Sequence, residues 1–537
     1  PAAATSPAKE PIVFYVDSGA PEPVRSALVE GASWWAQAFA AAGFENAYRV
    51  EVLPPGAHPL DARYNVIQWV HRATRGWSYG GGIVDPRTGE MVKGHVTLGS
   101  LRVRQDRLLF EGLVGADATG GGGANDPLVY ALARIRQLAA HEVGHALGFA
   151  HNFAASTYGR ASVMDYPAPL VRVTPAGELD LSQAYAAGVG AWDQHAARYA
   201  YSQFPPGADE EAALVAIVQE GLAQGLLFFG DEDARALGSA HPLAHLWDNG
   251  LDAAAGLEQA LAVRAVALAK FGAHNVAAGR PLASLQEVLA PVYFHHRYQL
   301  EAAAKLVAGL DYRHSTRGDG QPAAQPVDAA RQRQALAAVL TTLDPAALDL
   351  PEPVLALLLP RPPGEPPNRE LFAGRTDPAF DPLAAAATAA DMTVDLLLQP
   401  QRAARLVDLH RRQPTLPGLE EVLAALVEKT FGGPRPPDER RREVRRAVQW
   451  AVVEGLLELT RHPEASAAVV ARTDDALREL VPRLLPWTLR EGGSPGFVAG
   501  ADGPHAMYLI ARIERYLERG QEETAAGPQP QPPPPGA

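Results

Sequence analysis

No stretch limits the architecture of this chain more than residues 141–151, which read H-E-x-x-H-x-x-G-x-x-H. His141 and His145 are four positions apart, so on a helix they project from the same face, one turn above the other. Two imidazoles in this arrangement can grip one Zn²⁺, and Glu142 between them can reach a metal-bound water as general base. Gly148 allows the helix to stop and the chain to turn, which would bring His151 back as a third ligand and leave a fourth position open. The motif therefore predicts a catalytic zinc site.

The segment before the motif reads as the helix that carries it. Asp126 is a good N-cap residue and Pro127 is favoured at the first helical position, so we expect a helix over residues 128–147. Its apolar stripe consists of Val129, Leu132, Ile135 and Leu138. Polar side chains on a buried helix are costly unless they are paired, and metal coordination supplies the pairing.

Strand and helix patterns alternate near the start of the chain. The β-branched and aromatic residues of 12–16, 48–53 and 65–70 predict strands, and apolar positions at helical spacing predict a helix over 23–42. Strands that alternate with a long helix indicate a partly parallel sheet covered by helices.

Residues 77–85 predict an edge strand, because the consecutive glycines at 80–82 weaken it. Residues 85–89 read as a turn, and residues 95–99 as the strand that returns. His95 in that returning strand is interpreted as a strand residue, since three better placed histidines already suffice as ligands.

Residues 141–151 followed by Ser162-Val-Met-Asp-Tyr166 resemble the metzincins, zinc endopeptidases in which this long motif precedes a Met-turn. The resemblance implies that Met164 forms an apolar floor under the metal site. It also implies that Tyr166 ligates the metal at rest and supports the oxyanion during turnover, as in astacin-like and serralysin-like members. The alternative for Tyr166 is a packed aromatic side chain. Asn152, after the third histidine, departs from the best-known subfamilies.

The resemblance implies an α+β fold: a metzincin-like catalytic domain with a twisted mixed sheet, an antiparallel edge strand and an active-site helix. Substrate would lie along the edge strand by strand addition. The implied backbone contacts are Tyr79, Gly80, Gly81, Gly82 and Ile83. A glycine-rich surface hairpin without a ligand is the alternative. More specifically, the chain resembles a little-characterised group of bacterial zinc-dependent metalloproteases with a long helical C-terminal region, which implies a secreted or periplasmic location.

Composition excludes several other classes of protein. The formal net charge of −13 and the pI near 5.7 argue against a general nucleic-acid binder, because phosphate neutralisation requires a basic face. Cysteine is absent, so disulfides, thiol catalysis and thiolate metal ligands are ruled out. There is no apolar run of about 20 residues that would form a transmembrane segment. The residues from Pro1 onward show no signal-peptide pattern, which leaves export open.

At 537 residues the chain is too long for one core, so two or three domains are expected. The metzincin-like catalytic domain is expected over residues 1–207. Alanine-, leucine- and arginine-rich segments at helical spacing predict a mostly α-helical region over residues 208–526, with a sub-boundary near 360–367 where prolines cluster. The proline-rich residues 527–537 predict a disordered tail.

Other polar segments are interpreted without a site. Asp193, in a segment that resembles the closing helix of metzincin catalytic domains, would be structural. Asp231-Glu-Asp233 lacks the EF-hand pattern and reads as a solvated turn or helix cap. The arginines within 440–446 read as a solvated helix face. His295 and His296 could border a cleft, but adjacent histidines point to different faces of a helix and cannot easily share a metal.

The predicted function is hydrolysis of peptide bonds in a peptide or protein substrate, with one catalytic Zn²⁺ and Glu142 as general base. No spacing in the glycine-rich loop 115–125 supports a structural Ca²⁺. Two alternatives stay open: a zinc hydrolase of a non-polypeptide amide, such as one in cell-wall material, and a catalytically silent zinc-binding scaffold. The helical region is a candidate for shaping substrate access, docking a partner or covering the cleft. Cleavage specificity and oligomeric state do not follow from the sequence.

Overall fold

The computed structural model describes residues 5–72, 77–366, 368, 370–488 and 501–519, and within these ranges five strands form one sheet in the order β4-β2-β5-β7-β6. Strands β4, β2, β5 and β7 are parallel, and β6 pairs antiparallel with β7 at one edge. The bounds are Ile12–Val16 for β2, Tyr48–Val52 for β4, Asn65–Val70 for β5, Tyr79–Val84 for β6 and Met91–Gly99 for β7. The predicted mixed sheet with an antiparallel edge strand is confirmed, and with it the α+β class.

The helices on or beside the sheet are α1 (Val24–Ser33), α2 (Trp35–Ala41), α4 (Pro127–Ala146) and α5 (Ala191–Tyr201). The single helix predicted over 23–42 is divided at Trp34, whose N–H donates to the carbonyl of Gly31 at 3.1 Å in a turn tighter than the α-helix. Gly31 also lies where α1 crosses α4, since a Cβ added there would stand 2.0 Å from the carbonyl oxygen of Arg136. The close crossing of α1 and α4 therefore depends on glycine.

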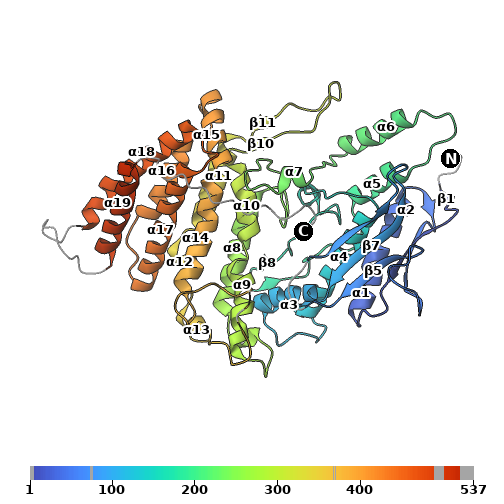
Figure 1. Ribbon diagram of the computed structural model, residues 1–537, viewed down its shortest axis with the longest axis horizontal. Helices are drawn as coiled ribbons and strands as arrows, with labels where there is room; N and C mark the ends of the chain where they lie inside the picture. The colour runs from blue at the N-terminus through green and yellow to red at the C-terminus, as the bar shows by residue number, and fades with distance from the viewer. Residues whose placement is uncertain (1–4, 73–76, 367, 369, 489–500, 520–537) are drawn as a thin grey trace.

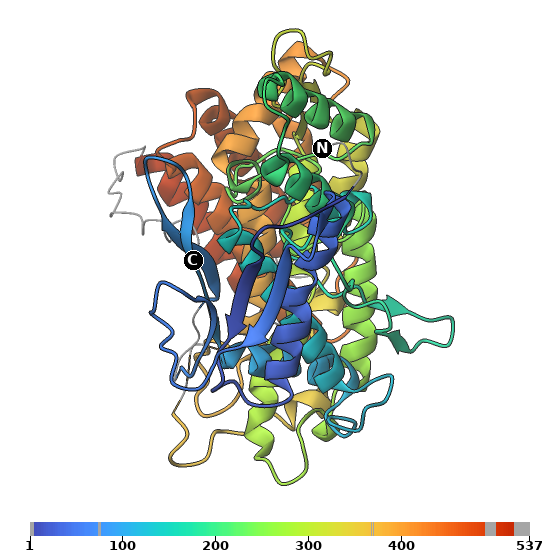
Figure 2. The same cartoon turned by 90° about the vertical axis from the view of Figure 1, so that its right-hand side faces the viewer.

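Beyond α5 the described chain is mainly helical. The longer helices here are α6 (Glu210–Ala223), α8 (Ala253–Lys270), α9 (Leu285–Tyr293), α10 (Arg297–Leu306), α11 (Ala329–Thr341), α14 (Pro382–Leu397), α15 (Pro400–Arg412), α16 (Leu419–Phe431), α17 (Glu439–Arg461), α18 (Ala467–Leu484) and α19 (Asp502–Arg519), while α3 (Leu101–Val114) comes earlier, between β7 and α4. In Figure 1 helix α6 lies above α5, and the helices from α8 to α19 lie to the left of the sheet as the colour changes toward red; Figure 2 shows the blue strands in front of them. The short helices are α7 (Asp231–Ala234), α12 (Pro345–Leu348) and α13 (Glu352–Leu355).

Short paired strands and 3₁₀ turns complete the described structure. The strands are β1 (Ser6–Pro7), β3 (Phe44–Glu45), β8 (Arg172–Val173), β9 (Leu179–Asp180), β10 (Leu310–Asp311) and β11 (Gln325–Pro326). The 3₁₀ turns are Ala155–Tyr158, Ala273–Asn275, Leu282–Ser284 and Leu485–Thr488.

Buried apolar side chains form three clusters. The sheet core surrounds the strands, α1, α2 and α4, and its largest buried side chain is that of Trp35. The helical core extends over α8 to α19 and also takes in Phe110 from α3. A joint cluster contains Phe153, Ala154, Phe229, Ala234 and Ala244. The joint cluster thus joins the segment after the zinc motif to the start of the helical region.

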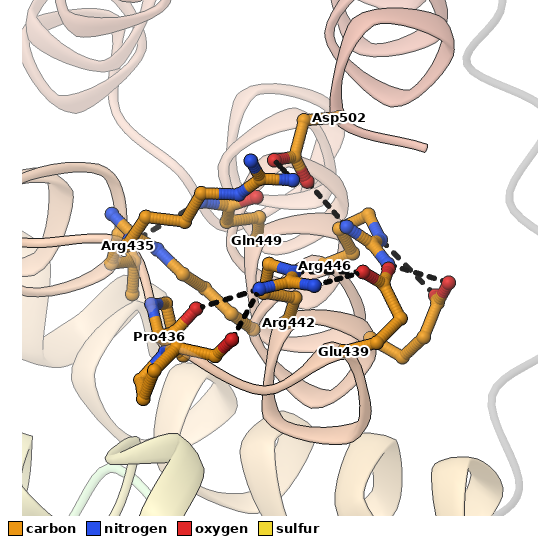
Figure 3. Close-up of polar contacts among 11 residues, drawn as sticks. Arg435, Pro436, Glu439, Arg442, Arg446, Gln449 and Asp502 are labelled. Carbon is orange, nitrogen blue, oxygen red and sulfur yellow. Dashed lines mark hydrogen bonds and ion pairs between the residues drawn. The ribbon is translucent and has the colours of Figure 1, made fainter. Parts of the chain in front are cut away.

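The arginines of α17 depart in part from the predicted solvated face. Arg440 is exposed, as expected, but Arg446 is only 6% exposed and bonds to Glu439, Glu443 and Asp502 (Figure 3). Asp502 begins α19, which packs over α17 and shields this part of the helix from solvent. The prediction is wrong for Arg446 because its acidic partner lies in a distant part of the sequence.

The predicted domain boundary at residue 207 and the sub-boundary near 360–367 stay predictions, and the tail at 527–537 lies outside the described residues. None of the helices in the described ranges combines the length and the apolar character needed to cross a membrane.

Candidate metal centre

Helix α4 carries the first two histidines of the motif. Its N-terminus is capped as predicted, because the Asp126 side chain accepts a hydrogen bond from the Leu128 N–H at 2.8 Å. The helix ends at Ala146, and Gly148 takes a φ of +97°, a left-handed conformation that glycine adopts without strain. The turn returns His151 toward the helix. The sequence-predicted meeting of three histidines is therefore present in the structure.

The three Nε2 atoms converge. His145 Nε2 lies 3.2 Å from His141 Nε2 and 3.1 Å from His151 Nε2. Four ligands in a tetrahedron around zinc, each at 2.0–2.1 Å, stand about 3.3 Å apart. Among the described residues, these histidines are the one group of at least three His, Asp or Glu side chains close enough to hold a metal ion. The spacing fits zinc with one coordination position left for water or substrate.

The Nδ1 atoms decide the tautomers. His141 Nδ1 lies 2.6 Å from the Val163 carbonyl and His145 Nδ1 lies 2.8 Å from the Phe149 carbonyl. A carbonyl oxygen can only accept, so each Nδ1 carries the proton and each Nε2 keeps a free lone pair. Burial and the neighbouring His151 lower the pKa of His145 to about 4, so its imidazole is neutral at pH 7. Two neutral rings whose Nε2 lone pairs point at each other cannot form a hydrogen bond. A metal cation between them can accept both lone pairs.

His151 is held differently from the other two ligands. Its Nδ1 lies 2.8 Å from an Asp231 carboxylate oxygen, so a side chain and not the backbone fixes its tautomer. Burial alone would raise the pKa of Asp231, but hydrogen bonds from His151 and Arg235 lower it to about 2. Asp231 is therefore an anion at the rear of the third ligand.

Glu142 lies on the buried face of α4 beside the edge strand. It is 5% exposed, and burial raises its pKa to about 8 despite the opposing effects of Arg134 and a hydrogen bond from the Gly80 backbone N–H. Strand β6 comes so close to α4 that a Cβ added at Gly80 would stand 1.8 Å from the Glu142 carbonyl oxygen. A glycine at this position therefore lets the edge strand reach the carboxylate.

The remaining residues of the predicted edge contact differ in environment. A Cβ added at Gly81 would meet no atom within 4 Å, whereas one added at Gly82 would stand 2.1 Å from the Met91 sulfur. Tyr79 is 49% and Ile83 is 60% exposed. Within the described residues β6 pairs with β7 alone, so its other edge is free of strand partners. Contact of these residues with substrate stays a prediction. His95 lies in β7 as the sequence predicted.

The Met-turn packs beneath the histidines. Met164 is 1% exposed, and its sulfur would stand 2.2 Å from a Cβ added at Gly144 of α4. Asp193 of α5 holds the turn by accepting hydrogen bonds from the Ser162 hydroxyl at 2.6 Å and from the Val163 N–H at 2.9 Å. The Val163 carbonyl in turn accepts from His141, so Asp193 supports a ligand through the turn.

Tyr166 stands against the ligand rings. Its ring centroid is 5.1 Å from that of His141 and 4.8 Å from that of His151. Its hydroxyl accepts a hydrogen bond from Arg235 Nη2 at 3.3 Å. Burial raises the pKa of Tyr166, so the phenol is a proton donor at pH 7. On its far side Tyr166 packs on Trp247, with ring centroids 5.0 Å apart.

Trp247 also lines a cavity of about 520 Å³ beside the metal centre. Its other walls include Pro167, Phe294 and Tyr298, so it lies between the segment after the Met-turn and helices α9 and α10. His295 lines this cavity too, whereas its neighbour His296 is buried. The cavity offers mainly aromatic and apolar walls close to Tyr166.

Sequence reasoning missed Asp231 and Arg235. Asp233 does serve as a predicted helix cap, since it accepts from the Gly230 N–H at 3.2 Å. Asp231 is about one third exposed, but it also contacts His151, which the sequence did not predict. Asn152, the departure from the best-known subfamilies, is fully buried and donates to the Leu227 carbonyl at 2.8 Å. Asn152 thereby brings the segment before α7 next to His151. The asparagine directly after the third histidine, which departs from the best-known subfamilies, was the available signal in the sequence.

Comparison with known proteins agrees with this geometry. A family model described as Met-zincin matches residues 123–436, which include the three histidines, Met164 and Tyr166 and continue through α16. No curated protein and no solved structure matches the chain.

Proposed function

The chain belongs to the Met-zincin family, and from that premise we propose that it is a zinc-dependent endopeptidase. The observation that carries the proposal is the convergence of three Nε2 atoms from His141, His145 and His151. When bound there, zinc supplies Lewis acidity: it lowers the pKa of a coordinated water and polarises the scissile carbonyl. The three histidines hold the ion, and the backbone carbonyls and Asp231 behind them keep the rings in place.

Glu142 is the proposed general base. Its carboxyl group is buried on the helix that carries His141 and His145, and it receives a hydrogen bond from the Gly80 N–H. Burial raises its pKa to about 8, and the positive charge of a bound zinc would lower that pKa and favour the ionised form that acts as the base. It takes the proton of the attacking water and delivers it to the leaving amine. A silent scaffold has no use for a buried carboxylate at this place, and this supports turnover over storage of zinc.

Tyr166 is the proposed donor to the oxyanion. Its phenol keeps its proton at neutral pH and stands beside the rings of His141 and His151. A hydrogen bond aimed at charge that develops in the transition state is worth about 10²–10³ in rate.

The free edge of β6 supports a polypeptide substrate. An extended peptide can add to this edge and pair with the open backbone groups of residues 79–83, the Gly80 N–H being already used by Glu142. Both ends of such a peptide are free to run on. That arrangement favours cleavage within a polypeptide chain. A non-polypeptide amide is a less suitable substrate, because it has no extended peptide backbone to pair with β6. The resemblance also supports a secreted or periplasmic place of action, which cell fractionation tests.

The test pairs zinc content with digestion of a peptide library, and it compares the native chain with Glu142→Ala. We expect one zinc per chain in both proteins and cleavage by the native protein alone, because loss of a general base typically costs 10²–10⁴-fold in rate. Absence of zinc from the native protein would overturn the metal site. Zinc without cleavage of any peptide would overturn the peptidase and leave the other amide or the scaffold.

A further inference from the structure

A short helix from beyond the expected catalytic domain lies against the metal centre. Helix α7 begins with Asp231 and is followed directly by Arg235. Of the three proposed ligands, His151 is the one whose Nδ1 is held by a side chain, and that side chain comes from α7. The third ligand therefore depends on a residue 80 positions away in the sequence.

The contact continues from Asp231 to the phenol of Tyr166. One carboxylate oxygen of Asp231 lies 2.8 Å from His151 Nδ1, and the other accepts from Arg235 Nε. Arg235 Nη2 then donates to the Tyr166 hydroxyl at 3.3 Å, and the guanidinium carbon lies 5.4 Å from the centroid of the Tyr166 ring. An unbroken series of hydrogen bonds thus joins the third ligand to the proposed oxyanion donor.

The helical part of the molecule fixes the place of α7. Asp233 accepts hydrogen bonds from the Tyr312 hydroxyl at 2.6 Å and from His314. The Ala234 carbonyl accepts from Lys305 Nζ of α10 at 2.6 Å. These bonds attach α7 to the rest of the helical region on the side away from the metal centre.

We propose that Asp231 and Arg235 are positioning residues: Asp231 holds His151 for the metal, and Arg235 holds the hydroxyl of Tyr166. A carboxylate on the rear nitrogen of a histidine fixes the tautomer and makes the ring a better ligand, typically by 10–100-fold in metal affinity. A cation beside the phenol fixes where its O–H points. The Arg235 half rests on the proposed function, whereas the Asp231 half concerns metal binding and stands without it.

The competing explanation is an ordinary ion pair that caps α7. Asp231 and Arg235 are four positions apart and about one third exposed, and such pairs usually contribute little to stability. An ion pair of this kind would affect neither metal affinity nor the rate of a chemical step. Both quantities therefore separate the two explanations.

The first experiment measures zinc affinity of the full chain by competition with a chelator. Asp231→Asn removes the charge and keeps the shape, and Asp231→Ala removes both; Glu232→Gln, on the same turn and exposed, is the matched control. We expect 10–100-fold weaker zinc binding for both Asp231 variants, with the control unchanged. Thermal unfolding of the metal-free proteins shows whether each variant is folded. Affinities within twofold of the native protein overturn the Asp231 half.

A spectroscopic readout keeps the Asp231 half falsifiable if Asp231→Ala fails to fold. With Co²⁺ in place of zinc, the visible absorption bands report the ligand field. We expect Asp231→Asn to shift these bands and Glu232→Gln to leave them in place. Identical spectra for all three proteins overturn the assignment.

The second experiment measures steady-state kinetics of Arg235→Met and Arg235→Lys, with the exposed Arg280→Met as control. We expect Arg235→Met to lower kcat about tenfold with KM unchanged, the size expected for one hydrogen bond from a charged donor, and Arg235→Lys to recover part of the loss. In a Tyr166→Phe background Arg235→Met should cost nothing further, because its target hydroxyl is gone. Equal losses in both backgrounds overturn the Arg235 half.

The outcomes distinguish this inference from the proposed function. If the native chain binds zinc and cleaves no peptide, the peptidase fails and the zinc affinities still test Asp231. If the native chain cleaves peptides and the Asp231 and Arg235 variants match it in affinity and kcat, the inference fails and the peptidase stands.

Discussion

The sheet core and the helical core bury polar side chains in different ways. In the helical core, Lys305 donates to two backbone carbonyls at 2.6 and 2.8 Å, and Gln332 both accepts from and donates to the backbone. In the sheet core, His141 and His145 use one ring nitrogen on a carbonyl and direct the other at each other. Burial alone therefore does not mark a functional group. A functional site is indicated where several buried side chains direct ring nitrogens without a hydrogen-bond partner at the same place.

The joint cluster connects the two cores next to the metal centre, so substitutions in the two regions should have different effects. In the proposed function the sheet side supplies the groups that act, and by the further inference α7 on the helical side supplies the groups that hold them. Changes near the motif should therefore affect turnover most, and changes far along the helical core should affect stability alone.

Removal of the metal is expected to have the largest effect. A chelator should abolish cleavage, and added Zn²⁺ should restore it, because every proposed step depends on the histidine site. Amide hydrogen exchange should rise around residues 141–151 and stay constant in α17. Undiminished cleavage by the metal-free protein would show that the histidine site is not the catalytic site. Faster amide exchange both in residues 141–151 and in α17 would show that metal loss affects the two cores alike.

Tyr166→Phe is expected to lower kcat by about 10²–10³, because it deletes the donor to the oxyanion. KM and zinc content should change little. Tyr199→Phe is the matched control, since Tyr199 is 45% exposed on α5. Equal kcat values for native protein and Tyr166→Phe would reduce Tyr166 to a packed aromatic side chain.

Neighbouring glycines of the edge strand provide a smaller and sharper comparison. Gly80→Ala places a Cβ against the Glu142 carbonyl oxygen, so β6 must shift, at a cost of about 1–3 kcal/mol in unfolding free energy. We expect kcat/KM to fall about tenfold or more, since the Gly80 N–H would move away from the Glu142 carboxylate. Gly81→Ala meets open space and should leave stability nearly unchanged. Equal effects of the two substitutions would contradict the close approach of strand and helix.

A buried carboxyl next to the joint cluster should make stability depend on pH. Asp248 is 8% exposed with one oxygen unpartnered, and burial raises its pKa to about 7 although Ser156 and Lys305 oppose the shift. The folded pKa exceeds the ordinary value near 3.9, so the ionised form costs stability above pH 7 and the cost vanishes below about pH 4. As the pH rises from 4 to 8, the free energy of unfolding of Asp248→Asn should therefore increase by roughly 2–4 kcal/mol relative to that of the native protein. Denaturant unfolding at both pH values measures this difference, and a constant difference would refute it.

Arg446→Met should leave turnover unchanged. It removes the bonds to Glu439, Glu443 and Asp502 that tie α19 to α17, so unfolding free energy should fall by about 1–3 kcal/mol. Arg440→Met, on the exposed side of α17, is the control with a smaller expected loss. A fall in kcat for Arg446→Met in the folded protein would break the division between the two cores.

Much of the site followed from the sequence because its determinants are local. One helical period places His141 above His145, and one glycine without Cβ allows the return of His151. The three consecutive glycines of β6 likewise predicted an edge strand, and β6 does lie at the edge of the sheet.

The failures have the opposite character. The contact of Asp231 and the burial of Arg446 were missed because their partners, His151 and Asp502, stand 80 and 56 positions away, and no periodic pattern links such residues. The break at Trp34 was missed because Trp34 keeps right-handed helical dihedral angles and only its N–H bond shifts to Gly31, a change that helix propensity does not detect. Local patterns thus predicted ligands, and tertiary contacts decided what holds them.

The separation of His151 from α7 in the sequence also affects the order in which the site can form during synthesis of the chain. Ribosomes add about 5–20 residues per second, so the 80 positions between His151 and Asp231 correspond to roughly 4–16 s of synthesis. During that interval a nascent chain already carries the histidines and Glu142 but lacks the carboxylate and the guanidinium that order them. If Asp231 and Arg235 hold the site as proposed, the site can be fully ordered only after α7 has been synthesised.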